Sequence, residues 1–182
     1  MGYSEDRHIK EAFEKAEYKK LSELLKRADP KSLEAEFYRG VMAENGLQGK
    51  IDKKAAQKHY VKAFADGKGS LKAGTALARI YQKEGDLDDA EEIYAKVLSQ
   101  ANSEDKTSIA YASYRLARIN FEKESDFVTA GKQYDQAIEI YARLAPNSKS
   151  HAKALYHRGQ LALRQNDITK AKECFQNSKD MG

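Results

Sequence analysis

The sequence has few of the residues that build cross-linked, collagen-like or membrane-spanning proteins. Among its 182 residues there is one cysteine, Cys174, two prolines and no tryptophan. A single cysteine excludes an internal disulfide framework and a cysteine-rich zinc site. The scarcity of proline, with only 11 glycines, excludes collagen-like and proline-rich chains. No run approaches 18 apolar residues, which excludes a membrane-spanning helix. The chain is nevertheless 41% hydrophobic, with 11 tyrosines and 6 phenylalanines, enough for one ordinary folded domain.

Charge and the N-terminal segment narrow the classes of partner. The 32 lysines and arginines exceed the 28 acidic residues by four, and the charges are spread along the chain. The basic runs Lys19-Lys20 and Lys53-Lys54 share their helices with glutamates or polar residues, which favours solvated faces over a nucleic-acid surface. We therefore expect no nucleic-acid partner and no membrane span.

The polar N-terminus favours a cytoplasmic protein as written, and a periplasmic or secreted one if a signal peptide has been removed.

One motif recurs along the chain at intervals of 34 to 41 residues. It has an acidic residue, a small or apolar residue four positions later, an aromatic or apolar residue four later, and a final small or apolar residue three later. This spacing marks one face of an α-helix, and aspartate suits the helix start. The copies are Glu17-Leu21-Leu25-Ala28, Asp52-Ala56-Tyr60-Ala63, Asp86-Ala90-Tyr94-Val97, Asp126-Ala130-Tyr134-Ala137 and Asp167-Ala171-Phe175-Ser178.

A second motif precedes the four stronger copies: a cluster of aromatic or apolar residues ending in a small one, at Gly40, Ala78, Ala117 and Gly159. A small residue lets the next helix approach closely, so each unit is predicted to be a helical hairpin. Strand-like alternation is absent, and the chain is predicted to be all-α. The expected helices span residues 4–15, 17–28, 33–45, 52–65, 70–84, 87–101, 104–123, 126–143, 148–165 and 167–179.

Two families of helical repeat resemble these units. The stretch Leu77-Ala78-x-x-Tyr81-x-x-x-Gly85-Asp86-x-x-x-Ala90-x-x-x-Tyr94 is similar to the tetratricopeptide repeat, in which twelve residues separate the two small positions. The last unit has the same interval, and the unit from Ala117 has thirteen. The first full unit has sixteen and resembles the Sel-one-like repeat through Gly40, Gly46, Asp52, Ala56, Tyr60, Lys62-Ala63 and Gly67. Arg39 and Arg158 depart from both families, which usually place a large apolar residue there.

The resemblance covers about residues 17–180. It implies a right-handed α-solenoid of stacked antiparallel helical hairpins, forming a single repeat domain over residues 1–182. The expected units are a partial N-terminal repeat at 17–32, a Sel-one-like repeat at 33–68, and tetratricopeptide-like repeats at 70–102, 104–146 and 148–180.

No pattern of catalytic, metal-binding or cofactor-binding residues emerges. The four histidines lack the spacing of a zinc site and are predicted to be solvated or hydrogen-bonded. Cys174, beside Phe175, is predicted to be a packing residue. Gly67-Lys68-Gly69-Ser70 lacks the strand and first glycine of a phosphate loop and is predicted to be a turn between repeats. We expect no enzyme activity, no metal and no cofactor.

The resemblance implies a scaffold or adaptor that binds a protein or peptide. The alternative is an inhibitory, regulatory or immunity-type subunit that buries a partner enzyme through an edge or convex face. In a tetratricopeptide hairpin the first helix lines a concave groove, at positions three before, one after and four after its small residue. The predicted groove residues, some one turn earlier, are Arg79, Gln82, Tyr111, Tyr114, Arg118, Phe121, Tyr156 and Gln160.

Arginine and tyrosine are the side chains that anchor interfaces best. We therefore expect an extended or helical segment with acidic residues to dock against Arg79, Arg118 and Tyr114. The other interpretation is that both arginines only form salt bridges with neighbouring helices.

Overall fold

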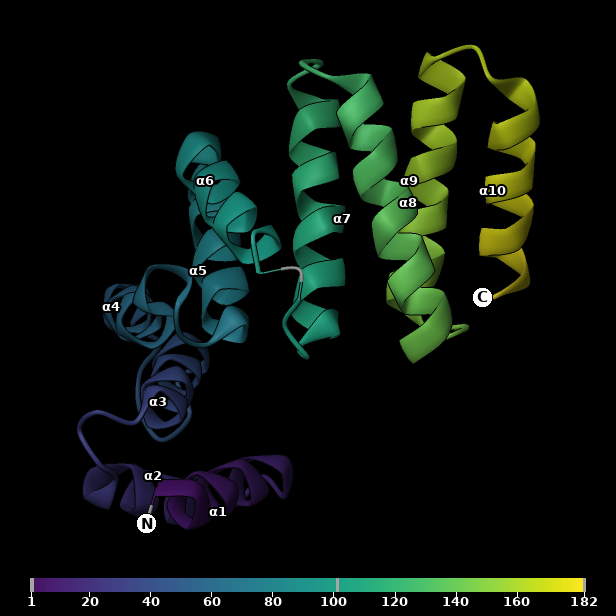
Figure 1. The fold of residues 1–182 in the computed structure, drawn as a ribbon. Helices are drawn as coiled ribbons and strands as arrows, with labels where there is room; N and C mark the ends of the chain where they lie inside the picture. Colours follow the sequence, from purple (N-terminus) through teal and green to yellow (C-terminus); the bar gives the residue numbers. More distant parts are fainter. Residues whose placement is uncertain (1, 101, 182) are drawn as a thin grey trace. The chain divides into compact units, whose positions relative to one another are not determined.

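A computed structural model describes residues 2–100 and 102–181, and its regular structure there is entirely helical. The ten helices predicted from the sequence are all present, so the all-α prediction is confirmed. The chain divides into two compact units, Met1–Gly85 and Asp86–Gly182 (Figure 1). This boundary falls inside the expected repeat 70–102, and the division into repeats stays a prediction.

Unit 1 contains five α-helices and a short 3-10 helix. Its helices are α1 (Gly2–Glu14), α2 (Tyr18–Arg27), α3 (Leu33–Asn45), α4 (Lys53–Phe64), η1 (Ala65–Gly67) and α5 (Leu71–Glu84). Helix α1 packs against α2 and α3, α3 against α4, and α4 against α5. One hydrophobic core joins α1, α2 and α3, and it includes Leu21, Leu25 and Ala28 of the weakest motif copy.

Unit 2 contains two complete hairpins preceded by a further helix. Its helices are α6 (Leu87–Leu98), α7 (Lys106–Glu122), α8 (Phe127–Leu144), α9 (Lys149–Arg164) and α10 (Ile168–Asp180). Each packs against the next in the order that Figure 1 shows. Helix α7 also contacts α9. The core between α7, α8 and α9 holds Tyr114, Ala117, Tyr134, Tyr141 and Leu161. The first helices of successive hairpins, α7 and α9, are thereby neighbours.

The helix starts follow from the aspartates of the motif, with one exception. The side chains of Asp52, Asp126 and Asp167 accept hydrogen bonds from backbone N–H groups three residues later, at 2.9, 2.9 and 3.0 Å. Asp86 occupies the same position in α6 without making this bond. The capping prediction is wrong for that copy. Ser32 makes an equivalent bond at the start of α3, at 3.0 Å.

The small and aromatic positions of the second, third and fourth copies are buried, as their spacing predicts, whereas Phe175 and Ser178 of the last copy are only partly buried. The tyrosines of the second, third and fourth copies, Tyr60, Tyr94 and Tyr134, are fully buried. The segment Gly67–Ser70 forms the predicted turn, and the Ser70 hydroxyl accepts the Ala73 N–H at the start of α5. The alanines at or below 1% exposure include Ala56, Ala78, Ala90, Ala117, Ala130, Ala137 and Ala171.

Candidate functional site

The predicted groove residues fall in both units. Arg79 and Gln82 lie on α5 of unit 1, whereas the other six lie on α7 and α9 of unit 2. The structure therefore gives two local groups, which are described separately.

In unit 1, Arg79 already has a carboxylate partner. Its Nη2 lies 2.7 Å from Oε1 of Glu44 on α3, and the other oxygen of Glu44 accepts the Tyr60 hydroxyl at 2.8 Å. Arg79 thus matches the interpretation in which it pairs with a neighbouring helix. Gln82 differs, because its Oε1 is buried without a hydrogen-bond partner in the described part of the chain.

In unit 2, a chain of hydrogen bonds joins α7 to α9. Nη1 of Arg118 lies 3.3 Å from Nε2 of His157, and Nδ1 of His157 lies 2.9 Å from Oε1 of Gln160. Gln160 in turn donates to the Tyr156 hydroxyl at 3.3 Å. Arginine can only donate, so Nε2 of His157 accepts and its Nδ1–H donates to Gln160. This assigns the neutral tautomer of the imidazole that carries its proton on Nδ1.

The electrostatics of this chain agree with a neutral histidine beside a charged arginine. Burial lowers the pKa of His157. The hydrogen bond that His157 donates to Gln160 acts to raise this pKa, and the positive charge of Arg118 acts to lower it. For Arg118 burial alone would lower the pKa, but the hydrogen bond to Glu122 and the neighbouring Tyr114 raise it. Nη2 of Arg118 lies 2.5 Å from Oε1 of Glu122, one turn along α7. Arg118 therefore carries its charge between a carboxylate and an uncharged imidazole.

Aromatic rings surround the hydrogen-bonded chain. The Tyr114 ring lies 5.8 Å from that of His157 and 6.1 Å from that of Tyr134. Tyr156 contacts Phe175 at 5.5 Å yet remains 47% exposed. We call this surface the α7/α9 face and define it as Arg118, Phe121, Tyr156, His157 and Gln160. Tyr114, predicted to line the groove, is only 8% exposed and belongs to the core.

Two predicted residues border this arrangement. Phe121 lies beside Phe127 at 6.0 Å, and the Arg164 guanidinium lies over the Phe121 ring at 5.8 Å. Tyr111, one turn before Tyr114, contacts Tyr94 at 6.4 Å, and Arg115 lies 5.6 Å above its ring. Phe121 thus extends the α7/α9 face, whereas the contacts of Tyr111 are with its own helix and α6.

Two residues of the site, His157 and Glu122, do not follow from the sequence pattern alone. His157 was predicted only to be solvated or hydrogen-bonded, and its place between Arg118 and Gln160 was not predicted. The signal was its spacing of three residues from Gln160, which puts both on one helical face. Glu122 follows Arg118 by four residues, a spacing that predicts an ion pair on a helix.

The α7/α9 face offers aromatic rings for stacking and polar side chains for hydrogen bonding.

Among the residues that the structure describes, no group of three or more His, Cys, Asp or Glu side chains could hold a metal ion. Across residues 2–100 and 102–181, no helix combines the length and the apolar character needed to cross a membrane. Cys174 is buried, and burial raises the pKa of its thiol, which disfavours a nucleophilic thiolate.

Comparison with known families matches the tetratricopeptide repeat twice. One model of this repeat matches residues 52–112 and a second matches residues 125–176. The first match begins at α4, the second helix of the unit with the sixteen-residue interval, and the second covers α8, α9 and most of α10. The sequence has no match among curated proteins.

Solved structures resemble the chain at low sequence identity and support the fold alone. PilF of Pseudomonas aeruginosa superposes with a TM-score of 0.74 at 12% identity, covering 100% of this chain and 76% of that one. MamA of Desulfovibrio magneticus gives 0.64 at 16% identity, covering 99% and 94%. A Sel1 repeat protein from Oxalobacter formigenes gives 0.64 at 17% identity, covering 98% and 83%.

Proposed function

The chain belongs to the tetratricopeptide-repeat family, and on this premise we propose that it is a non-enzymatic scaffold that holds a segment of a partner protein against its α7/α9 face. Tetratricopeptide repeats mediate protein–protein interactions in general, and the family consists largely of scaffolds without catalytic activity. The partner segment is extended or helical, and it lies across two neighbouring first helices of the repeat.

The observation that carries this proposal is the combination of a half-exposed tyrosine with an arginine that retains free donors. The guanidinium has five N–H groups, and His157, Glu122 and Tyr114 account for only part of them. The exposed ring of Tyr156 supplies apolar area at little cost in side-chain entropy. Arginine and tyrosine dominate the binding energy of many interfaces, and here they lie on adjacent helices.

An acidic residue of the partner would have to compete with the carboxylates that already pair with Arg118 and Arg79 in this chain. At Arg118 it would replace Glu122, which is half exposed and free to turn towards water. At Arg79 it would have to displace Glu44, which is also held by Tyr60. We therefore assign the acidic contact to Arg118; Arg79 and Gln82 lie in unit 1 and are not part of the α7/α9 face.

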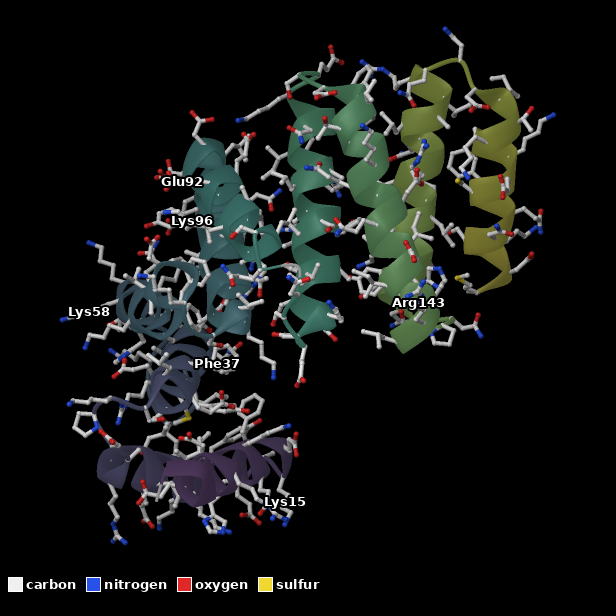
Figure 2. The ribbon with its side chains drawn as sticks, viewed as in Figure 1. Lys15, Phe37, Lys58, Glu92, Lys96 and Arg143 are labelled. Atoms are coloured by element: carbon white, nitrogen blue, oxygen red, sulfur yellow. The ribbon has the colours of Figure 1, made fainter. Side chains whose placement is uncertain are left out.

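The test uses two variants of the face and one matched control. Arg118→Glu reverses the charge of the face, and Tyr156→Ser removes its exposed ring. Arg143→Glu makes the same charge reversal on α8, where Arg143 is 75% exposed (Figure 2). Each variant and the parent chain are used to capture proteins from an extract of the native cell, and captured proteins are quantified by mass spectrometry.

We expect one captured protein to bind the parent chain and the Arg143→Glu control but neither of the two face variants. With that partner purified, each face variant should raise Kd about tenfold or more at an unchanged melting temperature, a loss of about 1.4 kcal/mol. Full binding by both face variants would contradict the proposal. If binding were then lost in Arg143→Glu, the inhibitory-subunit alternative with an edge or convex site would be favoured.

A further inference from the structure

A recess of about 460 Å³ opens in unit 1 between α2, α3 and the loop that joins α3 to α4. Its apolar lining consists of Leu25, Met42, Ala43 and Leu47. This volume lies in the range of sites that hold a small ligand or a short stretch of a bound peptide. The recess exists because this repeat has the longer loop between its two helices, the same feature that gives its sixteen-residue interval.

The charged side chains that line the recess are all basic. They are Lys26, Arg39 and Lys50, with His59 beside them. Neither Lys26 nor Lys50 has an ion-pair partner among the residues that the structure describes, and both are exposed. We call this site the cationic recess.

A buried carboxylate fixes the inner wall of the cationic recess. Glu36 is only 7% exposed, and its oxygens lie 2.8 Å from Nη1 of Arg39 and 2.7 Å from Nδ1 of His59. Nη2 of Arg39 also donates to the Leu25 carbonyl at 2.6 Å. One buried negative charge is therefore shared by Arg39 and His59, and the charges of Lys26 and Lys50 are left without compensation. Arg39 stands where both repeat families usually have an apolar residue, so this wall departs from their usual pattern.

A second hollow beside α2 shares Gln48 with the recess, and its lining includes Tyr18, Lys19 and Glu23, with charges of both signs. In the recess itself the apolar residues lie next to the uncompensated lysines. A small anion such as phosphate would gain nothing from the apolar floor. A peptide would use both the apolar floor and the lysines, and it is long enough to reach the second hollow.

We propose that the cationic recess is a second docking site, which binds an extended acidic segment of a partner protein, with a glutamate or aspartate between Lys26 and Lys50 and an adjacent leucine-sized residue on the apolar floor. The site is confined to unit 1. It is independent of the α7/α9 face, so either site can fail without the other.

The methionines of the chain give a direct test, because the sequence has three and only Met42 lines the recess. The full chain is labelled with ¹³C-methyl methionine, and Met42→Leu assigns the Met42 signal. The probe is the blocked hexapeptide Glu-Leu-Glu-Glu-Leu-Glu, and its matched control has glutamine in place of every glutamate. Inorganic phosphate and glutarate are titrated separately as small anions.

Variants of the chain locate the binding. Lys26→Glu with Lys50→Glu reverses two charges at the recess. Lys15→Glu with Lys58→Glu makes the same change in net charge elsewhere in unit 1, on side chains that do not line the recess (Figure 2). Melting temperatures of both double variants are measured, so that a loss of fold is distinguished from a loss of binding.

We expect the acidic peptide to shift the Met42 signal in a saturable way while the other two methionine signals stay in place. The recess variant should raise the Kd of the acidic peptide about tenfold or more, and the control variant should raise it less than about twofold. Adding 0.5 M salt should also weaken binding. Arg118→Glu should leave this titration unchanged. No Met42 shift at millimolar peptide, or an equal shift with the glutamine peptide, would overturn the proposal. The same shift with phosphate or glutarate at equal concentration would overturn it in favour of a small-anion site.

Discussion

Gly40 on α3 lies directly against the buried ring of Tyr60 on α4. A Cβ atom on Gly40 would come within 2.5 Å of Cε1 of Tyr60, closer than carbon atoms pack. The last hairpin repeats this relationship, since a Cβ on Gly159 would lie 2.7 Å from Cε1 of Phe175. In both hairpins the absence of one side-chain carbon sets the distance between the two helices.

Gly40→Ala should therefore destabilise the protein, although alanine is the better helix former. The Tyr60 ring is fully buried and has no room to move away, so we expect a loss of about 1–3 kcal/mol from overpacking. Gly131→Ala on α8 is the matched control, because its Cβ would meet nothing closer than 3.7 Å. That change should stabilise by about 0.5–1 kcal/mol. Urea unfolding measures both, and equal effects of the same sign would contradict the packing argument.

The hydroxyl groups of two equivalent tyrosines should differ in their contribution to stability. Tyr60 donates to Glu44, whereas the buried Tyr134 hydroxyl has no partner among the described residues. Tyr60→Phe should cost about 0.5–1.5 kcal/mol, since a satisfied hydrogen bond is lost beside a half-buried carboxylate. Tyr134→Phe should be neutral or stabilising. Thermal and urea unfolding of the two variants test this, and a larger loss for Tyr134→Phe would refute it.

The features that sequence analysis predicted correctly are local in the chain. The positions of the helices, the buried alanines and the buried Tyr60, Tyr94 and Tyr134 follow from spacings of three and four residues. The caps made by Asp52 and Asp126 are equally local. The capping prediction failed at Asp86, where the residue type and the position are right but the bond is not made.

The features that were missed depend on how successive hairpins stack. Arg79 and Glu44 are 35 residues apart, and Arg118 and His157 are 39 apart. Periodicity shows which side of a helix each residue occupies, but it does not show which residue of the next repeat lies opposite. That Arg118 and Gln160 share a binding surface stays a prediction, and their hydrogen-bond partners were not identified from the sequence.

Cys174 should be unreactive in the folded protein. Its side chain is 2% exposed, and burial raises the pKa of the thiol. Its reaction with Ellman's reagent at pH 8 should be at least about 100-fold slower than in denaturing urea, because attack requires local or global opening. Reducing agent should leave the melting temperature unchanged. A rate like that of free cysteine would show that α10 opens readily.

Two histidines should make the protein less stable in acid. His151 is 5% exposed, its Nδ1 has no partner in the described part of the chain, and burial lowers its pKa. Burial likewise lowers the pKa of His157, and Arg118 opposes its protonation. An unfolded histidine titrates near about 6.5. Below that pH the unfolded state takes up protons that the folded state does not, so the free energy of unfolding falls.

His151→Gln and His157→Gln should each make the free energy of unfolding depend less on pH. The quantity to compare is the decrease between pH 7.5 and 5.0 within each variant, because either substitution also changes packing at neutral pH. Each decrease should be smaller than in the parent chain, since one site of proton uptake by the unfolded state has been removed. His8→Gln, at an exposed histidine of α1, should leave the decrease unchanged. Urea unfolding at the two pH values measures the effect. An unaltered decrease in both variants would mean that the two imidazoles take up protons as readily in the folded protein as in the unfolded chain.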